Sequence, residues 1–123
     1  MKSELYTMLI PILKVKDLDA EVAFYRSLGF ELSYNGEDFK AIKYADCIEF
    51  GLGRKADVNV EDVLRHFTWQ IAVNSVQEVL DRCCEKNLEV VQDLKKYTYD
   101  FGDVYTITVK SPNGYDVVFE GDL

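Results

Sequence analysis

The side chains that perform most enzyme chemistry are sparse in this sequence. His66 is the single histidine, and it lies two residues before Thr68. On a strand, that spacing would put both side chains on one face roughly 6–7 Å apart, where His66 could act as a metal ligand. A histidine at the end of a strand or on the surface is the simpler interpretation. The sequence contains no serine–histidine–acid pattern and no phosphate-binding loop, and Gly51-Leu52-Gly53 is too short for a dinucleotide fingerprint.

The cysteines do not form a disulfide framework. There are three, and Cys83 and Cys84 are adjacent, so they cannot easily bridge within one helix. We interpret this pair as helix packing residues. An odd number of cysteines without a framework is typical of a reducing compartment, and we expect a cytoplasmic protein. The apolar stretch near the N-terminus is interrupted at Pro11 and is too short to cross a membrane.

The charge balance excludes some partners. Fourteen basic and twenty-two acidic side chains leave a net charge of −8. Nucleic acids and anionic membrane surfaces both require a basic face, so we expect neither as a partner. An acidic protein permits a cationic ligand without requiring one. The hydrophobic content of 48% in 123 residues is enough to bury a real core.

An internal repeat supplies the elements that must position any site. A shift of 58 residues aligns Val15 with Val73 and Gly29 with Asn87, and no gap is needed between these pairs. Gly29 and Asn87 each end a helix, because both residue types tolerate the left-handed conformation that follows one. The expected strands cover residues 8–15, 30–34, 39–44 and 46–52 in the first copy, and residues 67–73, a segment starting near 88, 104–110 and 115–120 in the second.

The helix of each copy carries its own start signal. In the first copy Asp17 or Asp19 can accept the free amide hydrogens of the first turn. In the second copy Ser75 and Glu78 have the spacing of a capping box. Apolar residues then recur at intervals of three and four, which predicts one buried face in each helix.

We therefore predict an α+β fold of two βαβββ modules. Neither module can bury its sheet face alone, so the two would form a cup-shaped mixed sheet with the helices on the outer faces. Such a cup would contain a ligand cavity. The expected organisation is a single domain, residues 1–123, with modules at about 5–53 and 66–123. The connector at 54–65 has a possible helical turn at 61–64.

Three segments of the first module and one turn near the end of the chain make a specific set. They are Val15-Lys16-Asp17-Leu18, Phe24-Tyr25, Leu28-Gly29-Phe30 and Ser111-Pro112-Asn113-Gly114-Tyr115. This set resembles the vicinal oxygen chelate superfamily, which includes glyoxalase, extradiol dioxygenases, fosfomycin resistance enzymes and bleomycin resistance proteins. Because its motifs are mostly packing and turn residues, the resemblance is specific for the fold and weak for the function.

The resemblance also implies where a metal would be held. The metal enzymes of the superfamily place four ligands inside the cup, and the matching positions here are Ile10, Glu49, Thr68 and Val118. Isoleucine and valine cannot ligate a metal, and a threonine hydroxyl is a poor ligand. A catalytic site needs about three good protein ligands. We therefore expect no metal and no other cofactor.

Strand alternation distributes the remaining side chains over two faces. It directs Trp69, Phe50 and Phe119 toward the helices, and the residues that share the parity of Glu49 and Thr68 into the cup. Glu49 is either a ligand-binding anion or a solvated carboxylate left from a metal-binding ancestor. The tyrosines of the 97–105 segment are either walls for a flat ligand or an ordinary edge strand and loop. The candidate ligand-binding residues are Glu49, Thr68, Gln70, His66, Phe39, Tyr99, Tyr105 and Asp116.

Bleomycin resistance proteins also lack the metal ligands, and their opening strand resembles Ile10-Pro11-Ile12-Leu13. The resemblance therefore implies a metal-free protein that sequesters a small molecule, cationic or aromatic, more readily than an enzyme. The alternatives are a glyoxalase-type lyase or isomerase with an atypical site, and a regulatory module whose cup is vestigial. The resemblance also implies a homodimer, in which Pro11 could mark the point where the first strand changes partner.

Overall fold

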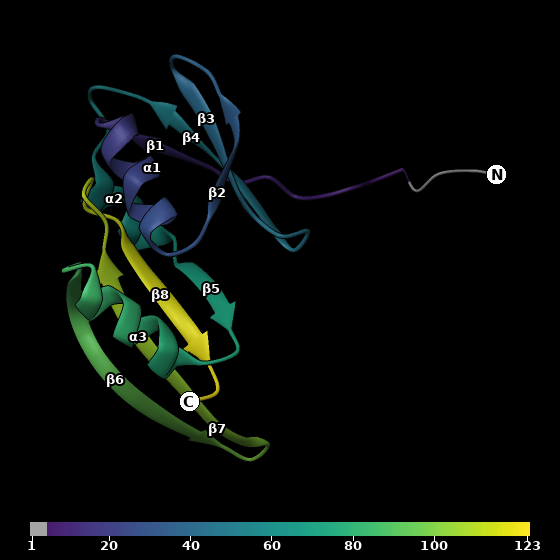
Figure 1. Ribbon diagram of the computed structural model, residues 1–123, viewed down its shortest axis with the longest axis vertical. Coiled ribbons are helices and arrows are strands. Elements are labelled where there is room, and N and C mark those ends of the chain that lie inside the picture. Colours follow the sequence, from purple (N-terminus) through teal and green to yellow (C-terminus); the bar gives the residue numbers. More distant parts are fainter. Residues whose placement is uncertain (1–4) are drawn as a thin grey trace. The chain divides into compact units, whose positions relative to one another are not determined.

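The computed structural model describes residues 5–123, which form two compact units (Figure 1). One unit extends to Ala56, and the other runs from Asp57 to Leu123. Each unit contains a four-stranded sheet, and the two sheets have equivalent strand orders, β1-β4-β3-β2 and β5-β8-β7-β6. In the described residues, no helix is both long enough and apolar enough to span a bilayer.

The first unit is a mixed sheet with one helix packed against it. Strand β1 runs parallel to β4, and the β4–β3 and β3–β2 pairs are antiparallel. Because β1 and β4 are parallel, the chain must cross over between them, and α1, β2 and β3 supply that connection. In chain order the elements are β1 (Ile12–Val15), α1 (Leu18–Ser27), β2 (Glu31–Asn35), β3 (Phe39–Tyr44) and β4 (Ile48–Arg54).

Helix α1 begins and ends at the residues that the sequence signals. The Asp17 side chain accepts a hydrogen bond from the Ala20 amide at 3.1 Å, which satisfies one of the free donors of the first turn. Gly29 follows the helix with a φ of 98°, a conformation that glycine adopts at little cost. The buried face of α1 packs Tyr25 edge-to-face against Phe50 of β4, with the ring centroids 4.9 Å apart.

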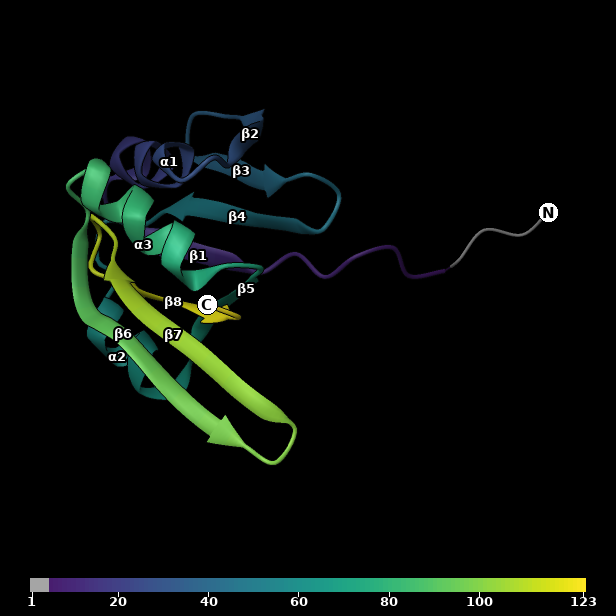
Figure 2. The same cartoon turned by 60° about the horizontal axis from the view of Figure 1, so that its bottom comes forward.

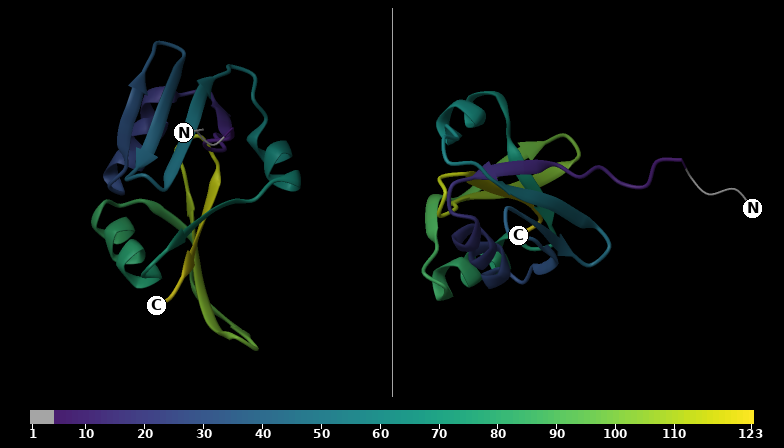
Figure 3. Two further views of the ribbon diagram at one scale, coloured as in Figure 1. Left: turned by 90° about the vertical axis from the view of Figure 1, so that its right-hand side faces the viewer. Right: turned by 90° about the horizontal axis from the view of Figure 1, so that it is seen from above.

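The second unit repeats this arrangement and adds a short helix before its first strand. In chain order its elements are α2 (Val60–His66), β5 (Trp69–Val73), α3 (Val76–Glu85), β6 (Glu89–Tyr99), β7 (Gly102–Lys110) and β8 (Asp116–Gly121). Helices α2 and α3 lie on opposite sides of this sheet (Figure 3). The β6–β7 hairpin extends past the end of α3 (Figure 2).

Local signals again explain the second unit. The Ser75 hydroxyl accepts a hydrogen bond from the Glu78 amide at 3.1 Å, which starts α3. Asn87 takes the left-handed φ of 56° after that helix. The turn before β8 is closed by a bond of 2.9 Å from the Gly114 amide to the Ser111 carbonyl, and Gly114 has a φ of 93°.

These observations confirm the predicted α+β class and its two βαβββ modules. Several strand boundaries were wrong: β4, β5 and β7 begin two residues away from the predicted starts. The largest error is in β1, which begins at Ile12, whereas a strand over residues 8–15 was predicted. Pro11 accepts a bond of 2.8 Å from the Gly51 amide through its carbonyl but has no amide hydrogen of its own to donate. Ladder pairing with β4 therefore ends at this proline, and residues 6–10 extend away from the sheet (Figure 1).

The connector between the two modules contains a longer helix than predicted, and this helix includes His66. The predicted helical turn at 61–64 is a helix of seven residues, capped by a bond of 3.1 Å from the Asp62 amide to the Asn59 side chain. His66 is the last residue of this helix and is exposed, and Thr68 precedes β5. The two residues do not alternate along one strand, so the expectation that they share a strand face was wrong.

Candidate functional site

The second sheet has one face packed on α3 and one face turned away from it, which we call the pocket face. Trp69, Ile71, Val117 and Phe119 are all less than a tenth exposed and form the α3 side. Their neighbours along β5 and β8 therefore point to the pocket face. The structure confirms the predicted burial of Trp69, Phe50 and Phe119.

A pocket of about 350 Å³ opens on the pocket face. Its floor comes from three adjacent strands, through Val118 of β8, Thr108 of β7 and Gln92 of β6, which the strand register places side by side. One wall comes from Leu64 of α2 and from the segment that follows it. The lining residues are Leu64, Phe67, Thr68, Trp69, Val91, Gln92, Thr108, Asp116 and Val118.

The pocket combines apolar surface with neutral hydrogen-bonding groups. Phe67 and Trp69 are both lining residues, and their rings stack with the centroids 5.8 Å apart, although the Trp69 side chain itself lies on the α3 side of the sheet. Thr68 and Thr108 supply hydroxyl groups, which can both donate and accept hydrogen bonds. The Gln92 side-chain amide donates to the Thr106 hydroxyl at 3.2 Å. This bond holds the amide in place beside the pocket.

Both carboxylates of β8 on the pocket face already have partners. Lys110 Nζ lies 2.7 Å from Asp116 Oδ1, in an ion pair whose side chains are only 35% and 39% exposed. The Gln70 side-chain amide donates to the Glu120 carboxylate. The negative charge of Asp116 is therefore compensated within the protein, and Glu120 is hydrogen-bonded to a neutral group.

The first sheet has a comparable face turned away from α1. Ile12 of β1 and Phe39 of β3 meet there over Gly51 of β4, where no side chain keeps them apart. Tyr34 lies beside Phe39, with the ring centroids 6.2 Å apart. Together these side chains make an apolar and aromatic patch on this face.

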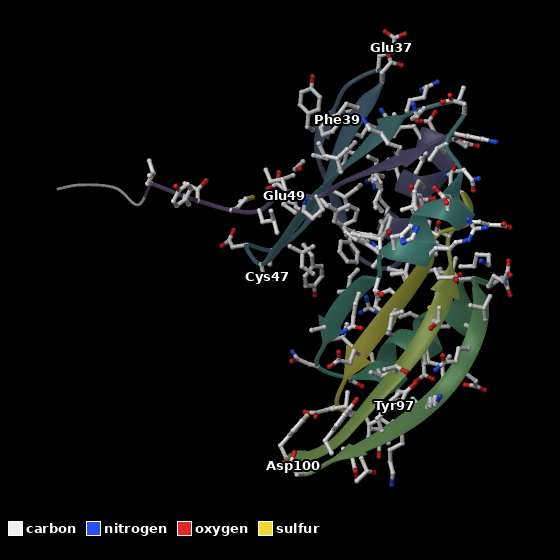
Figure 4. The ribbon with its side chains drawn as sticks, turned by 180° about the vertical axis from the view of Figure 1, so that it is seen from behind. Glu37, Phe39, Cys47, Glu49, Tyr97 and Asp100 are labelled. Carbon is white, nitrogen blue, oxygen red and sulfur yellow. The ribbon has the colours of Figure 1, made fainter. Side chains whose placement is uncertain are left out.

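Glu49 lies on the same face, two residues before Gly51 on β4 (Figure 4). Its side chain is half-buried and accepts a weak bond of 3.4 Å from the Ser33 hydroxyl. The register sets Lys43 of β3 directly opposite Glu49, and opposite charges on facing residues of a sheet attract each other. Glu49 is thus a partly solvated carboxylate beside the Phe39 patch and not a fully desolvated charge.

Six of the eight candidate residues lie in four places. Thr68 and Asp116 line the pocket, and Gln70 lies on the pocket face outside the lining. Phe39 and Glu49 share a face of the first sheet. His66 is at the exposed end of α2. The other two, Tyr99 and Tyr105, belong to β6 and β7.

The tyrosines are not grouped around the pocket. Tyr105 lies two residues before buried Ile107 on β7. Side chains two residues apart on a strand point to the same face, so the Tyr105 side chain lies on the α3 side of the sheet. Tyr99 is at the tip of the β6–β7 hairpin, where it stacks on Phe101 with the rings 5.1 Å apart and nearly parallel. Figure 4 shows Tyr97 and Asp100 on the same hairpin. The lining of the pocket includes no tyrosine of the 97–105 segment.

The sequence analysis did not identify four of the lining residues as candidates for a site. They are Leu64, Phe67, Gln92 and Thr108. A signal existed for Thr108, because it alternates with apolar Ile107 and Val109 on an expected strand. Gln92 follows a register shift in β6, which breaks the alternation that a sequence pattern could use. Leu64 gave no signal, since its role depends on where α2 packs.

The metal positions implied by the resemblance do not fit a catalytic metal. Two of the four carry hydrocarbon side chains, Ile10 and Val118, and Ile10 precedes β1 with 46% of its surface exposed. Within residues 5–123, no group of three or more histidine, cysteine, aspartate or glutamate side chains is arranged to hold a metal ion. The chemistry of the donor set therefore disfavours a metal-dependent mechanism at these positions.

Comparisons with known proteins place these features in a broader context. The profile described as the Glyoxalase/Bleomycin resistance protein/Dioxygenase superfamily matches residues 7–119. No curated protein sequence matches the chain.

Solved structures with the same fold share little sequence with this chain. A glyoxalase/bleomycin resistance protein/dioxygenase from Alicyclobacillus acidocaldarius is 13% identical, with a TM-score of 0.78 over 95% of this chain and 92% of that one. A glyoxalase/bleomycin resistance protein from Catenulispora acidiphila is 24% identical, with a TM-score of 0.69 over 94% and 97%. A bleomycin-binding protein complexed with bleomycin is 13% identical, with a TM-score of 0.72 over 96% and 100%. At these identities the likeness concerns the fold.

Proposed function

Because the chain belongs to the glyoxalase/bleomycin resistance protein/dioxygenase superfamily, we propose that it is a small-molecule-binding protein that sequesters its ligand without a metal ion. The superfamily fold supports both enzymes and binding proteins, so the site must decide between them. The observation that carries the proposal is the pocket of about 350 Å³ in the second unit, whose lining mixes apolar and hydrogen-bonding side chains. Its volume is at the lower end of the range, roughly 300–1,000 Å³, that small-molecule sites occupy.

The lining supports an aromatic ligand. Phe67 and Leu64 offer apolar contact at the wall, and Val118 offers it at the floor. Thr68, Gln92 and Asp116 can fix the orientation of a polar substituent through hydrogen bonds. The fold shared with the bleomycin-binding protein supports a ligand of this general kind.

The first unit has a face of its own that would suit a ligand with a basic group. Glu49 provides a carboxylate there, next to the apolar patch of Phe39 and Ile12. A carboxylate beside an aromatic ring favours an amine or guanidinium attached to an apolar body. We include Phe39 and Glu49, with Thr68 and Asp116, among the proposed ligand-binding residues.

The proposal extends to the cellular setting. A cytoplasmic location suits the exposed thiols of Cys47 and Cys84, which remain reduced in that compartment. We also propose a homodimer, because residues 6–10 carry exposed apolar side chains, among them Tyr6 and Leu9, that a second copy could cover.

Two measurements test the proposal together. A thermal-shift screen of the purified protein with aromatic compounds, half of them basic, should show stabilisation by a ligand that binds only the folded state. Elemental analysis of the same preparation should find less than a stoichiometric amount of any divalent metal. About one tightly bound metal ion per chain, together with turnover of a hemithioacetal, would support the glyoxalase-type alternative instead. No stabilisation by any compound would favour a regulatory module.

A further inference from the structure

We propose that the pocket of the second unit accepts an uncharged part of a ligand, and that Lys110 determines this selectivity by compensating the charge of Asp116. The inference rests on the proposed function, since it names the chemical class that the pocket selects. It concerns a residue outside the lining, which acts through another residue. The ligand part that it predicts is an aromatic ring bearing an amide or hydroxyl group.

The first step is the identity of the charged groups at the pocket. Among the described residues that line it, Asp116 alone has an ionisable carboxylate, and none has a basic side chain. Without a partner, Asp116 would make the pocket selective for cations. The selectivity of the pocket therefore depends on what Asp116 contacts.

The second step is the geometry of the ion pair. Lys110, the last residue of β7, and Asp116, the first residue of β8, are cross-strand partners. The strand register therefore puts the two side chains on the same face of the sheet. Lys110 Nζ lies 2.7 Å from Asp116 Oδ1, and roughly two thirds of each side chain is covered. Glu89 of β6 is the partner of Lys110 on its other side, but Glu89 is exposed and does not line the pocket. Water and salt therefore screen Glu89 more than Asp116.

The third step is what this pair does to ligands of different charge. A cation can reach a free acceptor position of Asp116, but the positive charge of Lys110, 2.7 Å from Asp116 Oδ1, repels the cation and offsets most of its attraction to the carboxylate. An anion is repelled by Asp116, which is the nearer of the two charges to the pocket. An uncharged donor loses nothing, because an ionised carboxylate has two oxygens with about four acceptor positions and Lys110 uses one of them.

The fourth step is the remaining surface. Leu64, Phe67 and Val118 are the apolar lining residues at the wall and floor of the pocket. The hydroxyls of Thr68 and Thr108 can accept from, or donate to, an amide group. A benzamide-like group matches this arrangement of one ring and one neutral polar substituent.

Three probes of nearly identical shape separate the charge classes. They are benzamide, benzamidine and benzoate, which are neutral, cationic and anionic at pH 7. Titration of each into the ¹⁵N-labelled protein, followed through the amide resonances of Thr108 and Val118, reports binding at this pocket. The wild type should bind benzamide more tightly than either charged probe.

The variants should move the preference in opposite directions. Lys110→Met leaves Asp116 without its partner, and the preference should shift toward benzamidine by about tenfold or more, the effect of one charge-assisted hydrogen bond. Asp116→Asn leaves Lys110 near the pocket and should shift the preference toward benzoate. The double variant should again prefer benzamide. Lys96→Met is the matched control, because it removes one lysine from an exposed ion pair with Asp103 on the same hairpin.

Several outcomes would overturn the inference. These are a wild type that prefers benzamidine, an unchanged preference in Lys110→Met, and an equal shift in Lys96→Met. If Lys110→Met does not fold, Lys110→Gln provides the same loss of charge, and the amide spectrum of each variant checks its fold. If no probe shifts the pocket resonances of any variant, the pocket is not a ligand site. The compound screen on the whole chain then still judges the proposed function by itself.

Discussion

The ring of Phe39 lies directly over Gly51 in the first sheet, so that a Cβ atom added to Gly51 would stand 2.5 Å from Phe39 Cζ. The same atom would stand 3.2 Å from Ile12 Cγ1. A Cβ contact of 2.5 Å essentially never occurs, and one of 3.2 Å is tighter than most, so the Phe39 ring above all would have to move. The aromatic patch beside Glu49 therefore exists because this position of β4 has no side chain.

Gly51→Ala should displace the Phe39 ring and destabilise the protein. Overpacking of this kind costs about 1–3 kcal/mol in the free energy of unfolding, which urea denaturation measures. Gly53→Ala is the matched control on the same face of β4, where the added atom would lie 3.1 Å from the mobile Nζ of Lys14. We expect Gly53→Ala to cost much less, and Phe39→Leu to recover part of the loss in Gly51→Ala. Equal costs for the two alanines would contradict this explanation.

Gly121→Ala should be more damaging than Gly51→Ala. The added Cβ would stand 1.9 Å from the Val73 carbonyl oxygen, which belongs to the backbone of β5 and cannot rotate away. Strands β5 and β8 would have to separate at this end, and we expect a loss of at least about 2 kcal/mol in the free energy of unfolding. Urea denaturation of Gly121→Ala beside Gly53→Ala measures the difference. A loss below that of Gly51→Ala would show that the strands adjust easily here.

The cysteines should differ in reactivity. Cys83 is fully buried, whereas Cys84 and Cys47 are exposed. Burial, with a smaller contribution from the neighbouring Cys84, raises the pKa of the Cys83 thiol to about 11, and a protonated thiol is a poor nucleophile. Titration with a disulfide reagent at pH 8 should detect two thiols in the folded protein and three in urea. Cys84→Ala should remove one fast-reacting thiol, and Cys83→Ala none.

The same thiol should make stability depend on pH. The Cys83 thiol has its ordinary pKa of about 9.0 in the unfolded chain and a pKa of about 11 in the folded chain, so the folded state binds more protons between these values. The contribution of the protonated Cys83 thiol to the free energy of unfolding is fully present below about pH 9, and it is lost as the pH rises to 11. Each unit of the pKa difference corresponds to about 1.4 kcal/mol, so the loss is at most about 3 kcal/mol. Urea denaturation at pH 8, 9, 10 and 11 should show a smaller decline for Cys83→Ala than for Cys84→Ala. Parallel curves would exclude a contribution from Cys83.

Glu49 should distinguish ligands by charge. Glu49→Gln should weaken a basic ligand from the compound screen by about tenfold, the effect of losing one charge-assisted hydrogen bond at a partly solvated site. A neutral ligand of the same shape should be almost unaffected. Thr68→Val should cost less, because a hydroxyl makes a neutral bond. Isothermal titration with matched basic and neutral ligands measures these losses, and equal losses for both would mean that Glu49 shapes the face without pairing with charge.

Much of the fold followed from short-range signals in the sequence. The Asp17 and Ser75 caps and the left-handed positions of Gly29 and Asn87 act within a few residues, so a local pattern contains them completely. Alternation on the strands likewise identified Trp69 as a residue that packs toward a helix. Two copies of the same element order then predicted the two modules.

The boundaries that failed depend on partners elsewhere in the chain. β1 has an apolar pattern from residue 8, but it pairs only from Ile12, because Pro11 lacks the donor that the ladder with β4 needs. α2 extends to His66 through its Asn59 cap, and the helix removes His66 from the strand face predicted for it.

The sequence by itself determined the fold class and the module order, and it predicted that Thr68, just before β5, and Asp116, at the start of β8, border one cavity. Only the tertiary structure decided that Lys110 compensates Asp116, that Gln92 and Leu64 join the pocket, and that Phe39 covers Gly51. Each of these contacts joins residues on different elements. The strand register and the packing of α2 set such contacts, and both are fixed by burial of the whole core and not by the few residues around each position.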